Sequence, residues 1–82
     1  MYSYLPLADI ERYMPEIIKL NVSTVARSPN QFLSQYKRYG SNLPYKWAVK
    51  RENFIKRHLA QYKENPTLRR KLALITWAYM PK

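Results

Sequence analysis

The sequence predicts an all-α fold: a compact bundle of four short helices, or five if Pro15 divides the first, with the C-terminal helix at the centre. Apolar side chains recur at spacings of three and four residues, the helical period, whereas alternation with a period of two is weak. The 82 residues are too few for more than a single small domain, which we place over residues 1–82. A domain of this size buries only about 60–65% of its unfolded surface, so its stability margin is narrow.

The first 20 residues are predicted to form an extended segment followed by a helix. Residues 1–6 contain two tyrosines and end in a proline, and we expect them to be extended. The helix is predicted over residues 7–20. Pro15 removes a hydrogen bond and clashes with the preceding turn, so a kink or a break is expected there.

A second helix is predicted from Pro29 to about Tyr39. Ser28 is a favourable N-cap residue, and proline is favoured at the first helical position that follows it. Gly40 is suited to the left-handed conformation that ends many helices.

The third and fourth helices are predicted over residues 44–63 and 68–79. Pro66 separates them, because the residue before a proline disfavours helical geometry. Thr67 is the expected N-cap of the fourth helix. This last helix is apolar on almost all sides, which is typical of a helix buried at the centre of a domain.

The charge of the chain is strongly positive and unevenly distributed. Fifteen Lys and Arg face five Asp and Glu, for a net charge of +10. Residues 1–21 carry two basic and three acidic side chains, a sum of −1, whereas residues 22–82 carry 13 basic and two acidic ones, a sum of +11. Such a field attracts polyanions, so nucleic acid, anionic lipid and acidic protein surfaces are the candidate partners.

Three cations occupy the first turn of the predicted fourth helix. Arg69, Arg70 and Lys71 follow the Thr67 N-cap, where the helix dipole is already positive. Each such charge costs about 0.3–1 kcal/mol at an exposed site, while the free N–H groups of the same turn attract anions. We therefore expect a phosphate group here. Alternatively, these cations point into water or pair with the acidic residues of the first helix.

A second candidate surface lies on the predicted third helix. Lys46, Lys50, Asn53 and Arg57 share one exposed stripe, and Arg38 precedes them on the second helix. Two helices joined by a short glycine-containing turn match the helix-turn-helix pattern, in which the second helix enters the major groove. Lys donates to guanine and Asn pairs with adenine. Contact with the phosphate backbone is favoured over such base readout, because most small helical domains contain this hairpin.

Aromatic side chains alternate with cations at two places. They are Tyr36-Lys37-Arg38-Tyr39 and Tyr45-Lys46-Trp47, and exposed rings among cations stack on the bases of single strands. At helical spacing, however, packing in the core is the favoured role of Tyr36, Tyr39 and Trp47. His58 falls in line with Phe54 on the third helix, and we expect it to be partly buried.

No catalytic, metal or cofactor site is predicted. The chain has no cysteine, its single histidine has no carboxylate three or four positions away, and one glycine cannot form a glycine-rich phosphate loop. Its serines have no histidine and aspartate arranged to activate them. We therefore expect no enzyme activity.

The stretch from Val25 to Tyr79 resembles small basic domains of unknown function that phages and large DNA viruses encode. The resemblance covers about two-thirds of the chain, implies a viral setting and supplies no catalytic residue. The residues that carry it are Val25-Ala26-Arg27-Ser28, Phe32-Leu33, Tyr36, Trp47, Lys50-Arg51, Phe54-Ile55, Arg57-His58-Leu59-Ala60-Gln61-Tyr62, Asn65-Pro66-Thr67, Arg69-Arg70, Leu72-Ala73-Leu74-Ile75 and Trp77-Ala78-Tyr79.

These observations predict a non-catalytic module that contacts the phosphate backbone of nucleic acid, with DNA favoured over RNA, and that serves a viral genome or its regulation. The alternative is a viral structural or inhibitory domain that docks an acidic protein surface. No stretch reaches the about 18–20 apolar residues of a membrane span, and no signal peptide is visible. We therefore expect a soluble, intracellular protein, in a viral setting located in the virion or in the host nucleus or cytoplasm. The sequence leaves its oligomeric state open.

Overall fold

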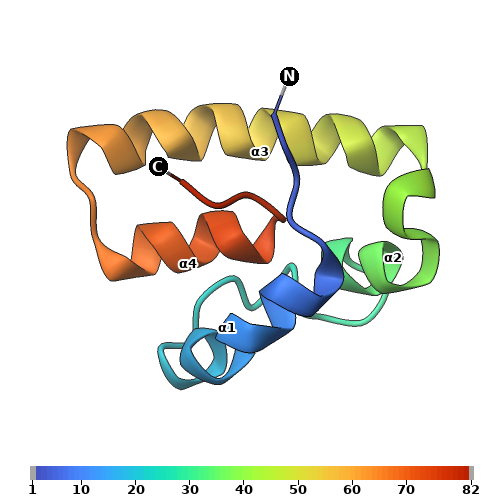
Figure 1. The fold of residues 1–82 in the computed structure, drawn as a ribbon, viewed down its shortest axis with the longest axis horizontal. Helices are drawn as coiled ribbons and strands as arrows, with labels where there is room; N and C mark the ends of the chain where they lie inside the picture. Colours follow the sequence, from blue (N-terminus) through green and yellow to red (C-terminus); the bar gives the residue numbers. More distant parts are fainter. Residues whose placement is uncertain (1, 82) are drawn as a thin grey trace.

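A computed structural model describes residues 2–81 (Figure 1). It contains α1 (Leu7–Lys19), α2 (Phe32–Tyr39), the short 3-10 helix η1 (Gly40–Asn42), α3 (Tyr45–Glu64) and α4 (Leu68–Thr76). Residues 2–81 contain no strand, so the predicted all-α fold is confirmed. The long helix α3 runs along one side of the domain, and α4 packs between it and α1, which confirms the central position of the C-terminal helix (Figure 1).

Helix α1 continues through Pro15 without a break, so the fold has four α-helices and the possible division into five is wrong. Pro15 lies on the exposed side of the helix, while Ile10 and Ile17 are fully buried on the other side. The carbonyl of Glu11 loses its usual N–H donor at Pro15. Because Glu11 is also exposed, water reaches this side of the helix and the cost of the missing hydrogen bond is small.

Helix α2 begins at Phe32, three residues later than predicted. The Ser28 hydroxyl does not cap α2, whose N-cap residue is Gln31; it donates a hydrogen bond to the carbonyl of Thr24 at 2.8 Å instead. Asn30 has a φ of 62°, which turns the chain away from a helical path. The Leu33 N–H then donates to the Ala26 carbonyl at 3.0 Å and fixes the first turn of α2 against this loop.

Helix α4 ends at Thr76 rather than Tyr79. Ala78 has a φ of 68°, and its N–H donates to the carbonyl of Ile75 at 2.9 Å. The N–H of Tyr79 donates to the carbonyl of Leu74 at 3.0 Å. These two bonds define a Schellman motif, in which the residue after the helix takes the left-handed conformation.

A column of parallel rings crosses the core from α2 to α3. Trp77 stacks on Phe32 at 4.4 Å between ring centroids and on Phe54 at 4.6 Å, with interplanar angles of 18° and 14°. Tyr36 extends the column beyond Phe32 at 5.4 Å, and His58 extends it beyond Phe54 at 3.9 Å. The column joins the C-terminal end of α4 to α2 and α3.

Candidate nucleic-acid interface

The predicted stripe on α3 is exposed along its whole length. Lys46, Lys50, Asn53 and Arg57 all lie on the solvent side of the helix. The same row continues to Gln61, four residues after Arg57, so it spans about 22 Å at the 1.5 Å rise of an α-helix. We call these five residues the α3 row.

No carboxylate of residues 2–81 forms an ion pair with the α3 row. Among residues 2–81 the only ion pair within 4.0 Å joins Arg12 to Asp9, at 3.7 Å, on α1. Glu52, the acidic residue in the middle of α3, instead accepts a hydrogen bond from the Tyr4 hydroxyl. Apart from the Lys50 ammonium, which lies 4.6 Å from the centroid of the Trp47 ring, the positive charge of the row is left for water or an external anion.

The cations in the first turn of α4 have partners inside the fold. Arg69 donates to the carbonyl of Leu20, and Arg70 donates from Nη1 to the carbonyls of Asn65 at 2.8 Å and Gln61 at 3.2 Å. These carbonyls lie at the C-terminal ends of α1 and α3, where the helix dipoles are negative. The unfavourable position of the two arginines on α4 is thus offset by two other helices, and neither pairs with an acidic residue of α1.

The other three predicted site residues, Thr67, Lys71 and Arg38, lie at different places in the structure. Thr67 is the N-cap of α4 as predicted, since its Oγ1 accepts a hydrogen bond from the N–H of Arg70 at 3.2 Å. Lys71 is half-buried. Arg38 is exposed near the end of α2, with its guanidinium 5.5 Å from the centroid of the Tyr39 ring.

A hollow of about 380 Å³ connects the α3 row to the start of α4. It is lined by Phe54, His58 and Gln61 from α3 and by Arg69 and Arg70 from α4. Gln61 is therefore both the last residue of the row and a wall of this hollow. The sequence predicts that both sets of cations contact phosphate but does not show how they meet. The fold brings them together because α3 and α4 pack side by side.

The aromatic residues divide into buried and exposed groups. Tyr36 and Trp47 are buried, with exposures of 7% and 8%, which confirms that packing is their role. Tyr39 is 40% exposed, so the expectation that it packs in the core is wrong: it lies at the C-terminal end of α2, beside the guanidinium of Arg38. Tyr45 is 84% exposed. His58 is half-buried as expected, and burial, followed by the nearby Arg57 guanidinium, lowers its pKa below the ordinary value.

Arg51 is a cation of α3 that belongs to the fold. Its guanidinium lies 3.5 Å from the ring centroid of Tyr4 and 5.8 Å from that of Tyr36. Its Nε is buried without a hydrogen-bond acceptor, and the aromatic faces supply the negative charge that compensates it. Burial, followed by Glu52, raises the pKa of Tyr4. Sequence spacing gave no sign of this contact, because Tyr4 comes from the extended N-terminal segment.

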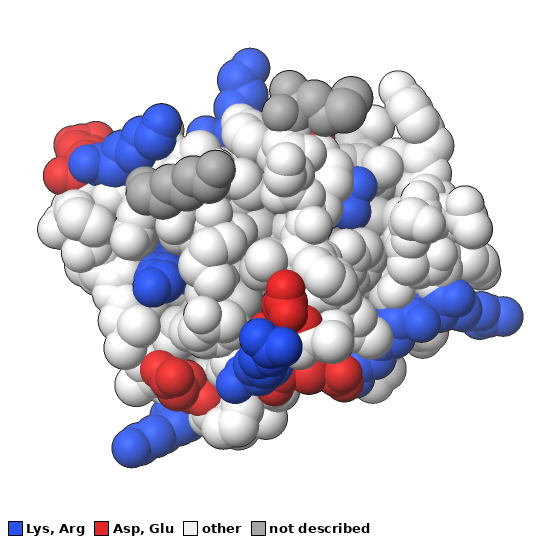
Figure 2. Space-filling view, in the orientation of Figure 1, with Lys and Arg blue, Asp and Glu red and all other residues white. Residues whose placement is uncertain are grey.

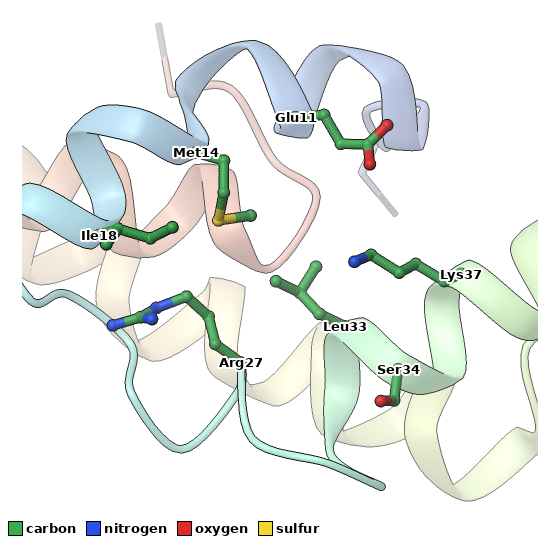
Figure 3. A pocket seen from close by; sticks show the side chains of 7 residues that line it. All are labelled: Glu11, Met14, Ile18, Arg27, Leu33, Ser34 and Lys37. Carbon is green, nitrogen blue, oxygen red and sulfur yellow. The ribbon is translucent and has the colours of Figure 1, made fainter.

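A groove of about 380 Å³ separates α1 from α2 (Figure 3). Met14, Ile18 and Leu33 form its apolar lining. Charged side chains of both signs stand around it, Glu11 from α1 and Lys37 from α2. This groove contains none of the predicted site residues.

Acidic side chains gather over α1 on the face drawn in Figure 2, and the Lys and Arg side chains seen there lie apart from one another, mostly toward the rim.

Residues 2–81 hold no cluster of three or more His, Cys, Asp or Glu side chains that could bind a metal ion. None of the helices described is long and apolar enough to cross a membrane.

The chain matches no model of a known protein family, no curated protein and no solved structure. Fold and surface define a small all-helical domain with an unneutralised basic edge.

Proposed function

We propose that this protein is a non-catalytic nucleic-acid-binding module that contacts the phosphate backbone through the α3 row and the first turn of α4. The observation that carries the proposal is the exposure of the α3 row, which has no carboxylate partner among residues 2–81. Its three cations, Lys46, Lys50 and Arg57, lie within about 17 Å along the helix and repel one another, and a polyanion relieves that repulsion.

The cations of α4 extend this surface at its C-terminal end. Arg69 and Arg70 line the hollow that Gln61 also lines. A guanidinium has five N–H donors, and the hydrogen bonds to helix carbonyls use only part of this capacity. A phosphate that follows the α3 row therefore reaches further donors beyond Gln61.

The test is fluorescence anisotropy with duplex DNA, single-stranded DNA and duplex RNA over a series of salt concentrations. Lys50→Gln/Arg57→Gln removes two charges from the α3 row. Lys56→Gln/Lys63→Gln is the matched control, because it removes two exposed cations of the same helix, also seven residues apart, from a different side. On duplex DNA each phosphate contact adds about 0.9 to the slope of log affinity against log salt, so the first variant should lower that slope by about 1.8.

The control variant should retain nearly the full slope. Equal losses in the two variants would show that affinity follows net charge rather than the α3 row, and would refute the assignment of the surface. No binding to any nucleic acid at low salt would refute the function itself. The resemblance to viral domains adds a setting to the proposal: condensation or packaging of a genome, its replication, or control of host transcription.

A second candidate function is docking onto an acidic protein surface. The groove between α1 and α2 favours it, since apolar Met14 and Leu33 lie beside Arg27 and Lys37 (Figure 3). A peptide with apolar side chains, whose acidic residues lie toward Arg27 and Lys37 and away from Glu11, complements this combination. Lys37→Gln/Arg27→Gln should abolish such binding and leave nucleic-acid affinity within about threefold, whereas Lys50→Gln/Arg57→Gln should weaken nucleic-acid binding and leave peptide binding unchanged.

A further inference from the structure

The hollow between α3 and α4 contains an aromatic surface as well as cations. His58 is the last ring of the column that crosses the core, and its inner side stacks on Phe54 at 3.9 Å with an angle of 16°. Among residues 2–81 no other ring stacks on His58. The histidine is half-buried and lines the hollow. The column therefore ends at His58, whose ring forms part of the wall of the hollow.

The stacking surface is held rigidly in place. Phe54 is fixed from behind by Trp77, and Trp77 in turn by Phe32, so the position of His58 depends on three packed rings. The lowered pKa of His58 keeps the imidazole neutral at pH 7, so it presents an uncharged aromatic face. A rigid surface loses little conformational entropy when a ligand binds.

Phosphate donors stand beside this surface. Arg70 is held by two carbonyls, of Asn65 and Gln61, and Arg69 by the carbonyl of Leu20. These bonds fix both guanidinium groups at the edge of the hollow before any ligand arrives. The exposed amide of Gln61 adds a donor and an acceptor that match the edge of a base.

We propose that this hollow binds one unpaired nucleobase, stacked on His58, with the adjoining phosphate on Arg69 and Arg70. The inference rests on the proposed function and specifies its substrate class: single-stranded nucleic acid, or duplex with an unpaired base or end. A paired base cannot enter, because its faces are covered by its neighbours in the stack. The hollow is the point where the α3 row ends, so a strand following the row delivers a base to it.

The test compares a single-stranded DNA 12-mer with a duplex of the same length at one salt concentration. His58→Ala should weaken single-strand binding about 5- to 150-fold, the effect of losing one base–aromatic stack of about 1–3 kcal/mol. His58→Phe should restore it, and duplex binding should change less than twofold in both variants. Equal loss on both nucleic acids, or no loss on either, would overturn the inference.

A second measurement separates stacking from a general effect on the fold. A 12-mer that carries 2-aminopurine should lose fluorescence on binding to the wild-type protein and to His58→Phe, but not to His58→Ala. If thermal melting shows His58→Ala to be unfolded, His58→Leu takes its place, since leucine fills the same space without an aromatic face. Quenching that survives in the non-aromatic variant would refute the His58 surface.

The two proposals fail in distinguishable ways. Binding that depends on Lys50 and Arg57 but not on His58 retains the nucleic-acid module and refutes only the base-binding hollow. If the wild-type protein binds no nucleic acid, both proposals are refuted.

Discussion

Replacing Trp77 should destabilise the domain more than replacing any exposed aromatic residue. Trp77 lies between Phe32 and Phe54 in the ring column, with centroid distances of 4.4 and 4.6 Å. It also occupies the C-cap of α4, so its ring ties the central helix to α2 and α3. Trp77→Ala removes both stacks and leaves a cavity where they met.

The expected loss is about 3–5 kcal/mol, the range for truncation of a large aromatic residue in a packed core, because the half-buried Trp77 ring packs between Phe32 and Phe54. A chain of 82 residues has a total free energy of unfolding of about 4–12 kcal/mol, at about 0.05–0.15 kcal/mol per residue. Trp77→Ala should therefore remove about a quarter or more of the stability. The melting temperature should fall by about 12–40 °C, because 1 kcal/mol corresponds to about 4–8 °C in a domain of this size. Trp77→Phe keeps a ring between Phe32 and Phe54 and should lose less than half as much.

The assay is urea unfolding followed by far-UV circular dichroism and by the emission of Trp47, which remains in the variant. Tyr45→Ala is the control, because this aromatic residue is 84% exposed and its removal should cost less than about 0.5 kcal/mol. A loss below about 1.5 kcal/mol in Trp77→Ala, or one equal to that of Tyr45→Ala, would refute the central role of the column.

Three further predictions concern stability measured by the same unfolding assay. Thr67→Ala should cost about 1 kcal/mol, because Oγ1 accepts the N–H of Arg70 at 3.2 Å, and Thr67→Ser should retain most of it. Asn21→Gly should raise the free energy of unfolding by about 0.5 kcal/mol, because Asn21 has a φ of 55° at the end of α1 and glycine takes that conformation without strain. A lower urea midpoint would contradict this. The pKa of His58 is lower in the folded protein than in the unfolded chain, so the unfolded chain takes up a proton at a higher pH, as the pH falls through about 6.5. The urea midpoint should therefore decrease from pH 7 to pH 5, and His58→Phe should flatten that dependence.

Helical periodicity predicted the helices but not all of their ends. The apolar spacing of α1 holds on both sides of Pro15, and the buried pair Ile10 and Ile17 keeps the helix continuous there. The start of α2 could not be predicted from the local sequence, since the Ser28 hydroxyl donates a hydrogen bond to the carbonyl of Thr24 and does not cap the helix. A capping residue predicts a helix end only where nothing nearby competes for its hydroxyl.

In the candidate site too, some features follow from residue spacing within one helix and others from contacts between residues far apart in the sequence. The α3 row follows from the geometry of one helix, so its exposure was predictable from residue spacing alone. The acceptor of Arg69, the carbonyl of Leu20, is 49 residues away in the sequence, and no local pattern reveals it. His58 was correctly expected to be half-buried, but the hollow beside it depends on how α4 packs on α3.

The hydrogen bonds of Arg69 and Arg70 decide which variants can test nucleic-acid binding. Removing either guanidinium leaves helix carbonyls without their donors, so lost affinity would mix a missing phosphate contact with a weakened fold. Arg70→Lys keeps the charge but not the fork that reaches two carbonyls at once. Lys50 and Arg57 have no carboxylate partner and no carbonyl acceptor among the described contacts, although the Lys50 ammonium lies 4.6 Å from the Trp47 ring. The α3 row is therefore where a change in binding can be assigned to the phosphate contact itself, and the arginines of α4 become informative once the melting temperature of each variant is known.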